Sequence, residues 1–208
     1  MGLLIVKNLY RRNIRVNYLY MFIMCLSLTQ GFWLIYLASK GMSLLQLGIL
    51  EGFFHVTSFI METPTGAIAD LYGRKFSRML GRLFLIVDLL LLLYGTCFTH
   101  YMISFAFCAI GYNLESGAGE ALVYDSLLEI GEADRYMKVN GLNEALYQIA
   151  QAFGLILGGF IAVQSYKSLY TGQIGIVLAS LAVAFFFTET TIGKGERQEA
   201  DIRQRLAG

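Results

Sequence analysis

Charged side chains are scarce in this 208-residue chain, and cysteine and histidine are scarcer still. Lysine, arginine, aspartate and glutamate make up 15% of the residues, whereas soluble domains carry about 25%. Three stretches, 18–38, 145–163 and 168–188, contain none of these four residue types. With 56% hydrophobic residues and a mean hydropathy of +0.57, the chain cannot hide its apolar surface in a soluble core. The solvent of this protein is therefore lipid.

The rarity of chemically reactive residues excludes several function classes. Cys25, Cys97 and Cys108 fall inside expected membrane spans, where apolar packing explains them better than disulfides or metal ligands do. The sequence has no His/Cys metal spacing, no nucleophile paired with a base and no phosphate-binding glycine loop. We therefore expect no enzyme activity, no cofactor and no metal. The basic residues gather at membrane boundaries, which argues against nucleic acid as a partner.

Six stretches are long enough to cross a hydrocarbon layer, which needs about 20 residues. We predict an all-α membrane protein with six transmembrane helices, over 17–38, 44–69, 77–98, 101–126, 140–163 and 168–188. The topology suits a bundle of two three-helix units in opposite orientation, the 3+3 inverted-repeat plan of many secondary transporters. Residues 1–16 are expected to form a cytoplasmic segment, and 189–208 a polar, linker-like cytoplasmic tail.

The basic residues are distributed unevenly about these spans. Of the 16 lysines and arginines, only Lys40 and Lys167 fall in segments on one side. The other side holds Lys7, Arg11, Arg12, Arg15, Arg74, Lys75, Arg78, Arg82, Arg135, Lys138, Lys194, Arg197, Arg203 and Arg205. Because cytoplasmic loops carry the excess of positive charge, we expect a multi-pass protein of the cytoplasmic membrane with both termini in the cytoplasm.

The loop after the second expected helix reads Gly66-Ala-Ile-Ala-Asp70-Leu-Tyr-Gly73-Arg74-Lys75. This pattern resembles the signature between helices 2 and 3 of the major facilitator superfamily. The stretches 62–66 and 116–127 resemble a bacterial branch of that superfamily. The resemblance covers the chain as the N-terminal six-helix half of a twelve-helix transporter.

The resemblance implies a secondary transporter of small molecules that works by alternating access, with proton coupling and, more weakly, efflux favoured. Its partner would be a second six-helix bundle, supplied by a missing C-terminal half, a second copy or another chain. The alternative is a truncated or half-size bundle that transports nothing itself and acts as a membrane scaffold or regulator. Two departures weaken an assignment to drug/proton antiporters: Asn113 stands where those carry a buried arginine, and 154–159 lacks their proline.

The resemblance also implies a conformational latch, made of Gly66, Asp70, Gly73, Arg74, Lys75 and Asp125. In the family the acid of the loop caps and pairs locally, while the arginine bridges to an acid at the inner end of helix 4. A charge cluster at the lipid headgroups is partly desolvated, so breaking it is costly. Gly66 would let helices approach closely, and Gly73 would allow a strained turn. Alternatively, Arg74, Lys75, Arg78 and Arg82 only fix the topology and touch anionic lipid.

Polar residues within the spans are expensive and indicate a cavity or a partner. The candidates for proton or ion coupling are Glu51, His55, Glu62, Glu115 and Glu120, and those for substrate contact are Gln30, Trp33, Asn113 and Gln148. Since Glu51, His55, Ser58 and Glu62 share a helix face, a structural polar seam is the equal alternative for that group. Asp88 must be protonated, paired or turned inward, and no role follows for it. Gly154, Gly158 and Gly159 are expected at close helix contacts.

Overall fold

The computed structural model describes the backbone of residues 2–190 and the side chains of residues 7–190. This part of the chain consists of helices and short irregular connections. The helices are α1 (Gly2–Cys25), α2 (Trp33–Ser39), α3 (Leu44–Tyr72), α4 (Arg74–Tyr94), α5 (Phe98–Ile130), the 3₁₀ turn η1 (Ala133–Arg135), α6 (Tyr136–Gln164) and α7 (Tyr166–Ala184). The predicted all-helical class is confirmed. Of the predicted tail, residues 191–208 lie outside the described residues.

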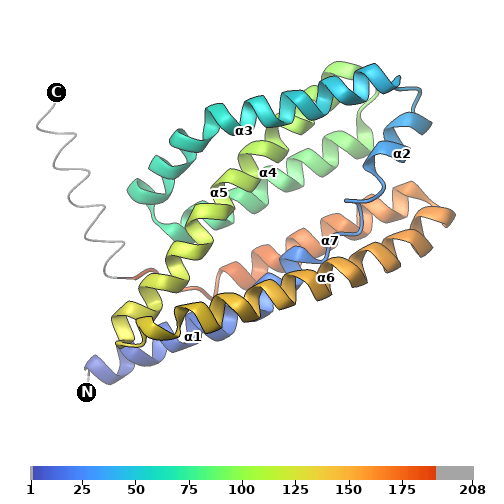
Figure 1. Ribbon diagram of the computed structural model, residues 1–208. Helices are drawn as coiled ribbons and strands as arrows, with labels where there is room; N and C mark the ends of the chain where they lie inside the picture. The colour runs from blue at the N-terminus through green and yellow to red at the C-terminus, as the bar shows by residue number, and fades with distance from the viewer. Residues whose placement is uncertain (1, 191–208) are drawn as a thin grey trace, which may run out of the picture.

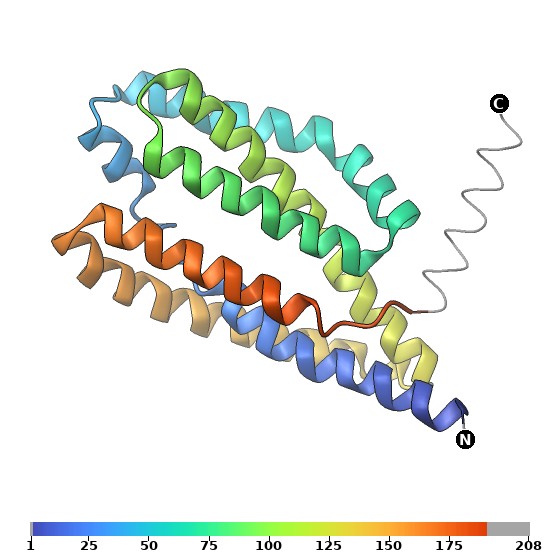
Figure 2. The same ribbon diagram turned by 180° about the vertical axis from the view of Figure 1, so that it is seen from behind.

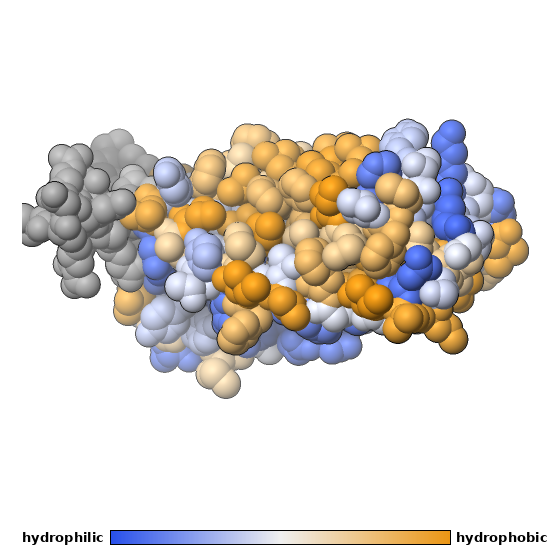
Figure 3. Space-filling model, turned by 90° about the horizontal axis from the view of Figure 1, so that it is seen from above, coloured by the Kyte–Doolittle hydropathy of each residue, from blue (hydrophilic) through white to orange (hydrophobic). Residues whose placement is uncertain are grey.

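Three helical segments are long and apolar enough to cross a membrane by themselves: Leu44–Tyr72, Ala133–Gln164 and Tyr166–Ala184. Large apolar side chains remain exposed on several helices, including Leu44, Phe160 and Val163. Figure 3 shows hydrophobic residues over much of the middle of one face of the molecule. Exposed apolar surface on this scale is suited to contact with lipid or with another bundle.

The helices form two layers (Figure 1). One layer contains α3, α4 and α5, the other contains α1, α6 and α7, and Figure 2 shows the same division from behind. The layers meet mainly where α4 packs on α7 and α1 packs on α5. The start of α1, the α3–α4 turn, the α5–α6 connection and the end of α7 all lie at one end of the bundle. We call residues 66–75, which resemble the family signature, the signature loop. We call this end of the bundle the signature end, because it contains that loop.

α4 illustrates how the sequence produces this packing. Its buried positions recur every three or four residues, as expected for one helix face. They are Ser77, Arg78, Gly81, Arg82, Leu85, Asp88, Leu89 and Leu92. A Cβ on Gly81 would lie 2.8 Å from the carbonyl oxygen of Gly111, so the backbones of α4 and α5 are in direct contact there.

The first predicted helix, 17–38, is wrong as a continuous element. α1 ends at Cys25 and α2 begins at Trp33, which leaves 26–32 irregular. Ser27 and Thr29 are residue types whose side chains can compete with helical backbone hydrogen bonds, and Gly31 disfavours a helix. The N–H of Leu28 donates instead to Oε1 of Gln173 on α7, at 2.7 Å. In an apolar environment such a break persists only where the protein supplies the missing partners.

α6 packs directly against this break. A Cβ on Gly158 would lie 2.2 Å from the carbonyl oxygen of Leu28, and one on Gly154 would lie 2.6 Å from that of Ser27. The close contacts predicted for these two glycines are confirmed. At Gly159 the nearest atom would be 3.6 Å away, which is ordinary contact.

The other five expected helices correspond to α3–α7, with ends displaced by up to about four residues. One consequence is that Cys97 lies exposed in the α4–α5 connection and not within a span.

Candidate functional site

The signature loop joins α3 to α4 through a single residue. Gly73 has φ = +101°, a value that L side chains rarely adopt, which explains glycine at this position. Immediately after it, the guanidinium of Arg74 forms an ion pair with Asp125 on α5. Both side chains are largely buried. The structure therefore brings together two of the charged residues that the family resemblance singled out, Arg74 and Asp125.

The segment after α7 completes this cluster, which the sequence did not reveal. The carboxylate of Glu189 accepts the backbone N–H groups of Arg74 and Lys75, each at 3.1 Å. A carboxylate at a helix N-terminus is favourable because the first N–H groups lack helical partners. The hydroxyl of Thr190 lies 3.3 Å from Oδ2 of Asp125 and donates to it. We call these five residues the Arg74 cluster; it connects α4, α5 and the end of α7.

Two predicted latch residues lie apart from the Arg74 cluster. Asp70 is exposed near the end of α3 and makes no hydrogen bond or ion pair within residues 7–190. The expected close approach at Gly66 is wrong for this part of the chain, since a Cβ there would meet no described atom within 4 Å. The reason is geometric: this side of α3 is exposed and turned away from α4 and α5.

A buried charge cluster lies one turn further along α4. Arg78 is 0% exposed and Arg82 is 2% exposed, so neither touches lipid, and the lipid contact considered as the alternative for these two arginines is wrong. Nε of Arg78 donates to Oε1 of Glu115 at 2.8 Å, and Arg82 lies 3.6 Å from Oε2. The hydroxyl of Tyr20 donates to the same Oε2 at 2.7 Å. One carboxylate thus pairs with two guanidinium groups. We call Arg78, Arg82, Glu115 and Tyr20, with the asparagines that bind them, the Arg78 cluster.

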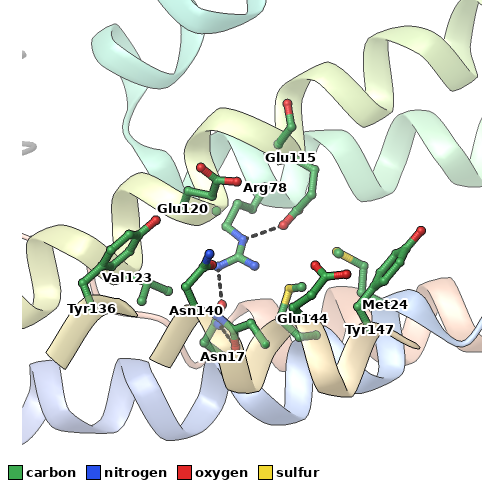
Figure 4. Close-up of a pocket in the computed structure, with 14 residues that line it drawn as sticks. Asn17, Met24, Arg78, Glu115, Glu120, Val123, Tyr136, Asn140, Glu144 and Tyr147 are labelled. Atoms are coloured by element: carbon green, nitrogen blue, oxygen red, sulfur yellow. Dashed lines mark hydrogen bonds and ion pairs between the residues drawn. The ribbon is translucent and has the colours of Figure 1, made fainter. Parts of the chain in front are cut away.

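Two asparagines extend this Arg78 cluster into the other helix layer. Nη1 of Arg78 donates to Asn17 on α1, and Asn17 in turn donates to Asn143 on α6, both at 3.1 Å. The guanidinium also lies 4.2 Å from the ring centre of Tyr20 and 4.6 Å from that of Phe187, which are cation–π distances. Figure 4 shows Arg78 between Glu115 and Asn17. The cluster connects both layers.

Four members of the Arg78 cluster, Asn17, Arg78, Glu115 and Asn143, line a cavity of about 210 Å³, which we call the Arg78 cavity. Other lining residues include Glu120, Tyr136, Asn140, Glu144 and Tyr147 (Figure 4). Of the coupling candidates, Glu115 and Glu120 face this cavity. Gln148, a candidate for substrate contact, is exposed and donates to Glu144 at 2.8 Å.

A second cavity of about 370 Å³, the Asp88 cavity, is bounded by the break at 26–32 and by α2 to α7. Gln30 and Trp33, both predicted substrate contacts, line it together with Glu51. Asp88 is 5% exposed, faces this cavity and accepts a hydrogen bond from the Ser104 hydroxyl. The sequence left Asp88 protonated, paired or turned inward; the structure turns it inward.

Some polar residues on α3 are exposed, whereas another forms hydrogen bonds to α5. His55 lies 3.3 Å from Glu51, and both side chains are well exposed, as is Glu62. Ser58 and Asn113 bind each other reciprocally: the Ser58 hydroxyl donates at 2.8 Å, and the Asn113 amide donates to the Ser58 carbonyl at 2.6 Å. Asn113 therefore ties α5 to α3, which is the polar seam considered as the alternative for this face.

A third ionic contact lies at the signature end, outside the apolar spans. Glu132, in the α5–α6 connection, binds Arg11 of α1 at 2.9 Å and also binds Arg135. Hydrogen bonds from these two arginines hold the pKa of Glu132 below its usual range. Its charge thus ties α1 to the α5–α6 connection at neutral pH.

The chain is similar to known proteins at the level of a family and over one short segment. The family model described as Major Facilitator Superfamily matches residues 11–208. A segment of 45 residues is 40% identical to the protein named "Uncharacterized MFS-type transporter YxaM" of Bacillus subtilis (strain 168). That segment is 22% of this chain and 11% of the relative, so the match spans only about a tenth of the relative's length.

Proposed function

Because the chain belongs to the Major Facilitator Superfamily, we propose that its helices form one six-helix bundle of a secondary transporter for a small molecule. The bundle rocks against a second six-helix bundle, which is a further part of the same protein, a second copy or another chain. The observation that carries the proposal is the Asp88 cavity, which lies beside a broken helix. Broken helices at a binding site are typical of secondary transporters.

The packing supports a 3+3 inverted repeat. We count α1 and α2 as the first span and α3 to α7 as the second to sixth. Exchanging the first span with the fourth, the second with the fifth and the third with the sixth maps one layer, α3–α4–α5, onto the other, α6–α7–α1. The contacts between the layers, α1 on α5 and α4 on α7, map onto themselves. Two repeats related by a two-fold axis would give this pattern.

The charge distribution supports a cytoplasmic signature end. Arg11 lies on the first half of α1, Arg74 begins α4 and Arg135 ends η1, all at that end. At the opposite end, Lys40 caps α2 and Lys167 lies in the first turn of α7. An excess of basic residues on one side is typical of the cytoplasmic side of a membrane protein.

The transport proposal is tested by reconstituting the protein in liposomes. Compounds that raise its melting temperature are first selected, and their uptake is then followed with and without an imposed pH gradient. For a proton-coupled transporter, accumulation requires the gradient and collapses when a protonophore is added. Compounds that bind but are never moved would favour the scaffold alternative.

The hypothesis that the Arg74–Asp125 ion pair acts as a conformational latch can be tested by substituting Arg74. Removing one partner of a buried ion pair leaves the other charge uncompensated, so Arg74→Ala should destabilise the facing state that contains the Asp125 contact. We expect the initial transport rate to fall about tenfold, which corresponds to roughly 1.4 kcal/mol between the two states. The rate is measured in the liposomes described above, and gel filtration reports folding.

Arg11→Ala is the matched control for Arg74→Ala. It also removes an arginine from an ion pair at the signature end, but the Arg11 side chain is 55% exposed. Exposed pairs contribute little, so transport should be unchanged. Normal transport by well-folded Arg74→Ala protein would contradict the hypothesis that the Arg74–Asp125 ion pair acts as a latch.

A further inference from the structure

We propose that the Asp88 cavity binds an organic ammonium cation, and that this cation and a proton compete for the carboxyl group of Asp88. The inference rests on the proposed transporter function and names the class of its substrate. It would assign Asp88 the coupling role that sequence reasoning gave to other acids.

The charges lining the cavity favour a cation. Two acidic residues, Glu51 and Asp88, contribute to the walls, and none of the described lining residues is lysine, arginine or histidine. These described residues would supply no positive charge to balance an anionic ligand. A neutral polar ligand could be bound by the amide side chains, but it would leave the buried carboxylate of Asp88 without a counter-charge.

Aromatic rings form much of the remaining wall. They belong to Trp33, Phe54, Phe105, Tyr112, Tyr147 and Tyr170. The faces of such rings attract cations, and quaternary ammonium groups are recognised in this way. A volume of about 370 Å³ also falls in the range of small-ligand sites. Acidic groups among aromatic rings are therefore the chemistry expected for an amine or a quaternary ammonium ion.

Asp88 has no basic partner of its own. Within residues 7–190 it forms no ion pair, and the neutral Ser104 hydroxyl and Cys108 thiol are the hydrogen-bond donors to its carboxylate. An ionised carboxylate that is buried without a counter-charge is costly, so an empty cavity favours the protonated form. A cation in the cavity favours the ionised form instead. Competition between proton and cation follows from these opposite preferences.

The other titratable groups facing the cavity are Glu51 on α3, Cys108 and Tyr112 on α5, Tyr147 on α6 and Tyr170 on α7. The Glu51 side chain is half exposed and pairs with His55 at 3.3 Å, so Asp88 is the buried carboxyl group without a counter-charge. Arg82, on the same helix as Asp88, is paired with Glu115. The hydroxyl of Tyr170 is buried and lacks a hydrogen-bond partner in the described part of the chain. It is a polar group left for a ligand or for water in the cavity.

The test is isothermal titration calorimetry on the purified protein in lipid nanodiscs, which needs no transport. The probes are two permanent cations, benzyltrimethylammonium and tetraphenylphosphonium, with the anion phenylmethanesulfonate as control. Titrations in buffers of different ionisation enthalpy count the protons. We expect at least one cation to bind and the anion not to bind. Protons should be released on cation binding, up to one per cation at a pH where Asp88 is protonated in the empty cavity, which is the most that linkage at one carboxyl allows.

Asp88→Asn should lower the affinity for the cation about tenfold and abolish the release of protons. Asp134→Asn, an exposed change of the same chemistry in η1, should alter neither. Failure of both cations to bind, or proton release retained in Asp88→Asn, would overturn the inference. If Asp88→Asn does not fold, modification of the wild-type protein by dicyclohexylcarbodiimide replaces it: Asp88 should be labelled, and the bound cation should protect it. Labelling without protection counts against the site.

These outcomes separate the inference from the proposed function. Cation binding with proton release but without any transport would leave the site standing and remove the transporter. Proton-driven uptake of a neutral compound, unchanged in Asp88→Asn, would keep the transporter and remove the cation site.

Discussion

Glu115→Gln is expected to cost the bundle roughly 3–5 kcal/mol of stability, the range found when one partner of a buried ion pair is removed. The reason is that Arg78 and Arg82 would remain buried without their carboxylate. Arg78→Met should cost less, because Glu115 would keep Arg82 and the Tyr20 hydroxyl as partners. Thermal unfolding of the purified proteins in detergent measures the order of the two.

The double variant Arg78→Met/Glu115→Gln tests whether Arg78 and Glu115 act as a pair. It leaves one buried arginine, Arg82, without a carboxylate, whereas Glu115→Gln alone leaves two, so the double variant should be less destabilised than the sum of the single variants. The control is again Arg11→Ala, which removes an arginine from a more exposed ion pair and should hardly change the melting temperature. Strictly additive effects, or a larger loss for Arg78→Met than for Glu115→Gln, would contradict the geometry described above.

The inward position of these arginines could be predicted from the sequence of α4. Arg78, Arg82 and Asp88 fall on the same helical face as Leu85 and Leu89, at spacings of three and four residues. The distribution of basic residues along the chain had suggested, as an alternative, that both arginines contact the lipid headgroups. Their partner could not be predicted, because Glu115 is 37 residues from Arg78 and depends on which helices pack together.

Hydropathy predicted most helices because lipid requires each spanning segment to satisfy its own backbone hydrogen bonds. The same rule led us to expect a continuous helix over 17–38, without the break at 26–32. The groups that stabilise it, Gly158 on α6 and Gln173 on α7, lie far along the chain, so no local pattern shows them. Likewise, the family resemblance identified Arg74 and Asp125, but it did not reveal that Glu189 caps α4.

Gly158→Ala is expected to destabilise the bundle strongly. The new Cβ would lie 2.2 Å from the carbonyl oxygen of Leu28, and the obstacle is backbone that cannot rotate away. Overpacking costs about 1–3 kcal/mol even where side chains can adjust, so we expect a loss at or above that range. Because Ser27 and Thr29, on either side of Leu28, line the Asp88 cavity, cation binding should weaken as well. Thermal unfolding and calorimetry measure the two effects.

Gly159→Ala is the matched control, one residue further along the same helix. Its Cβ would meet Phe32 at 3.6 Å, an ordinary contact. Both substitutions gain the same helix propensity, about 1 kcal/mol in favour of alanine, so that gain cancels in the comparison. Only the contact with the broken segment differs between them. Equal melting temperatures for the two variants would mean that α6 does not pack on the break; a large deficit at Gly158 alone would mean that this contact holds the broken helix in place beside the cavity.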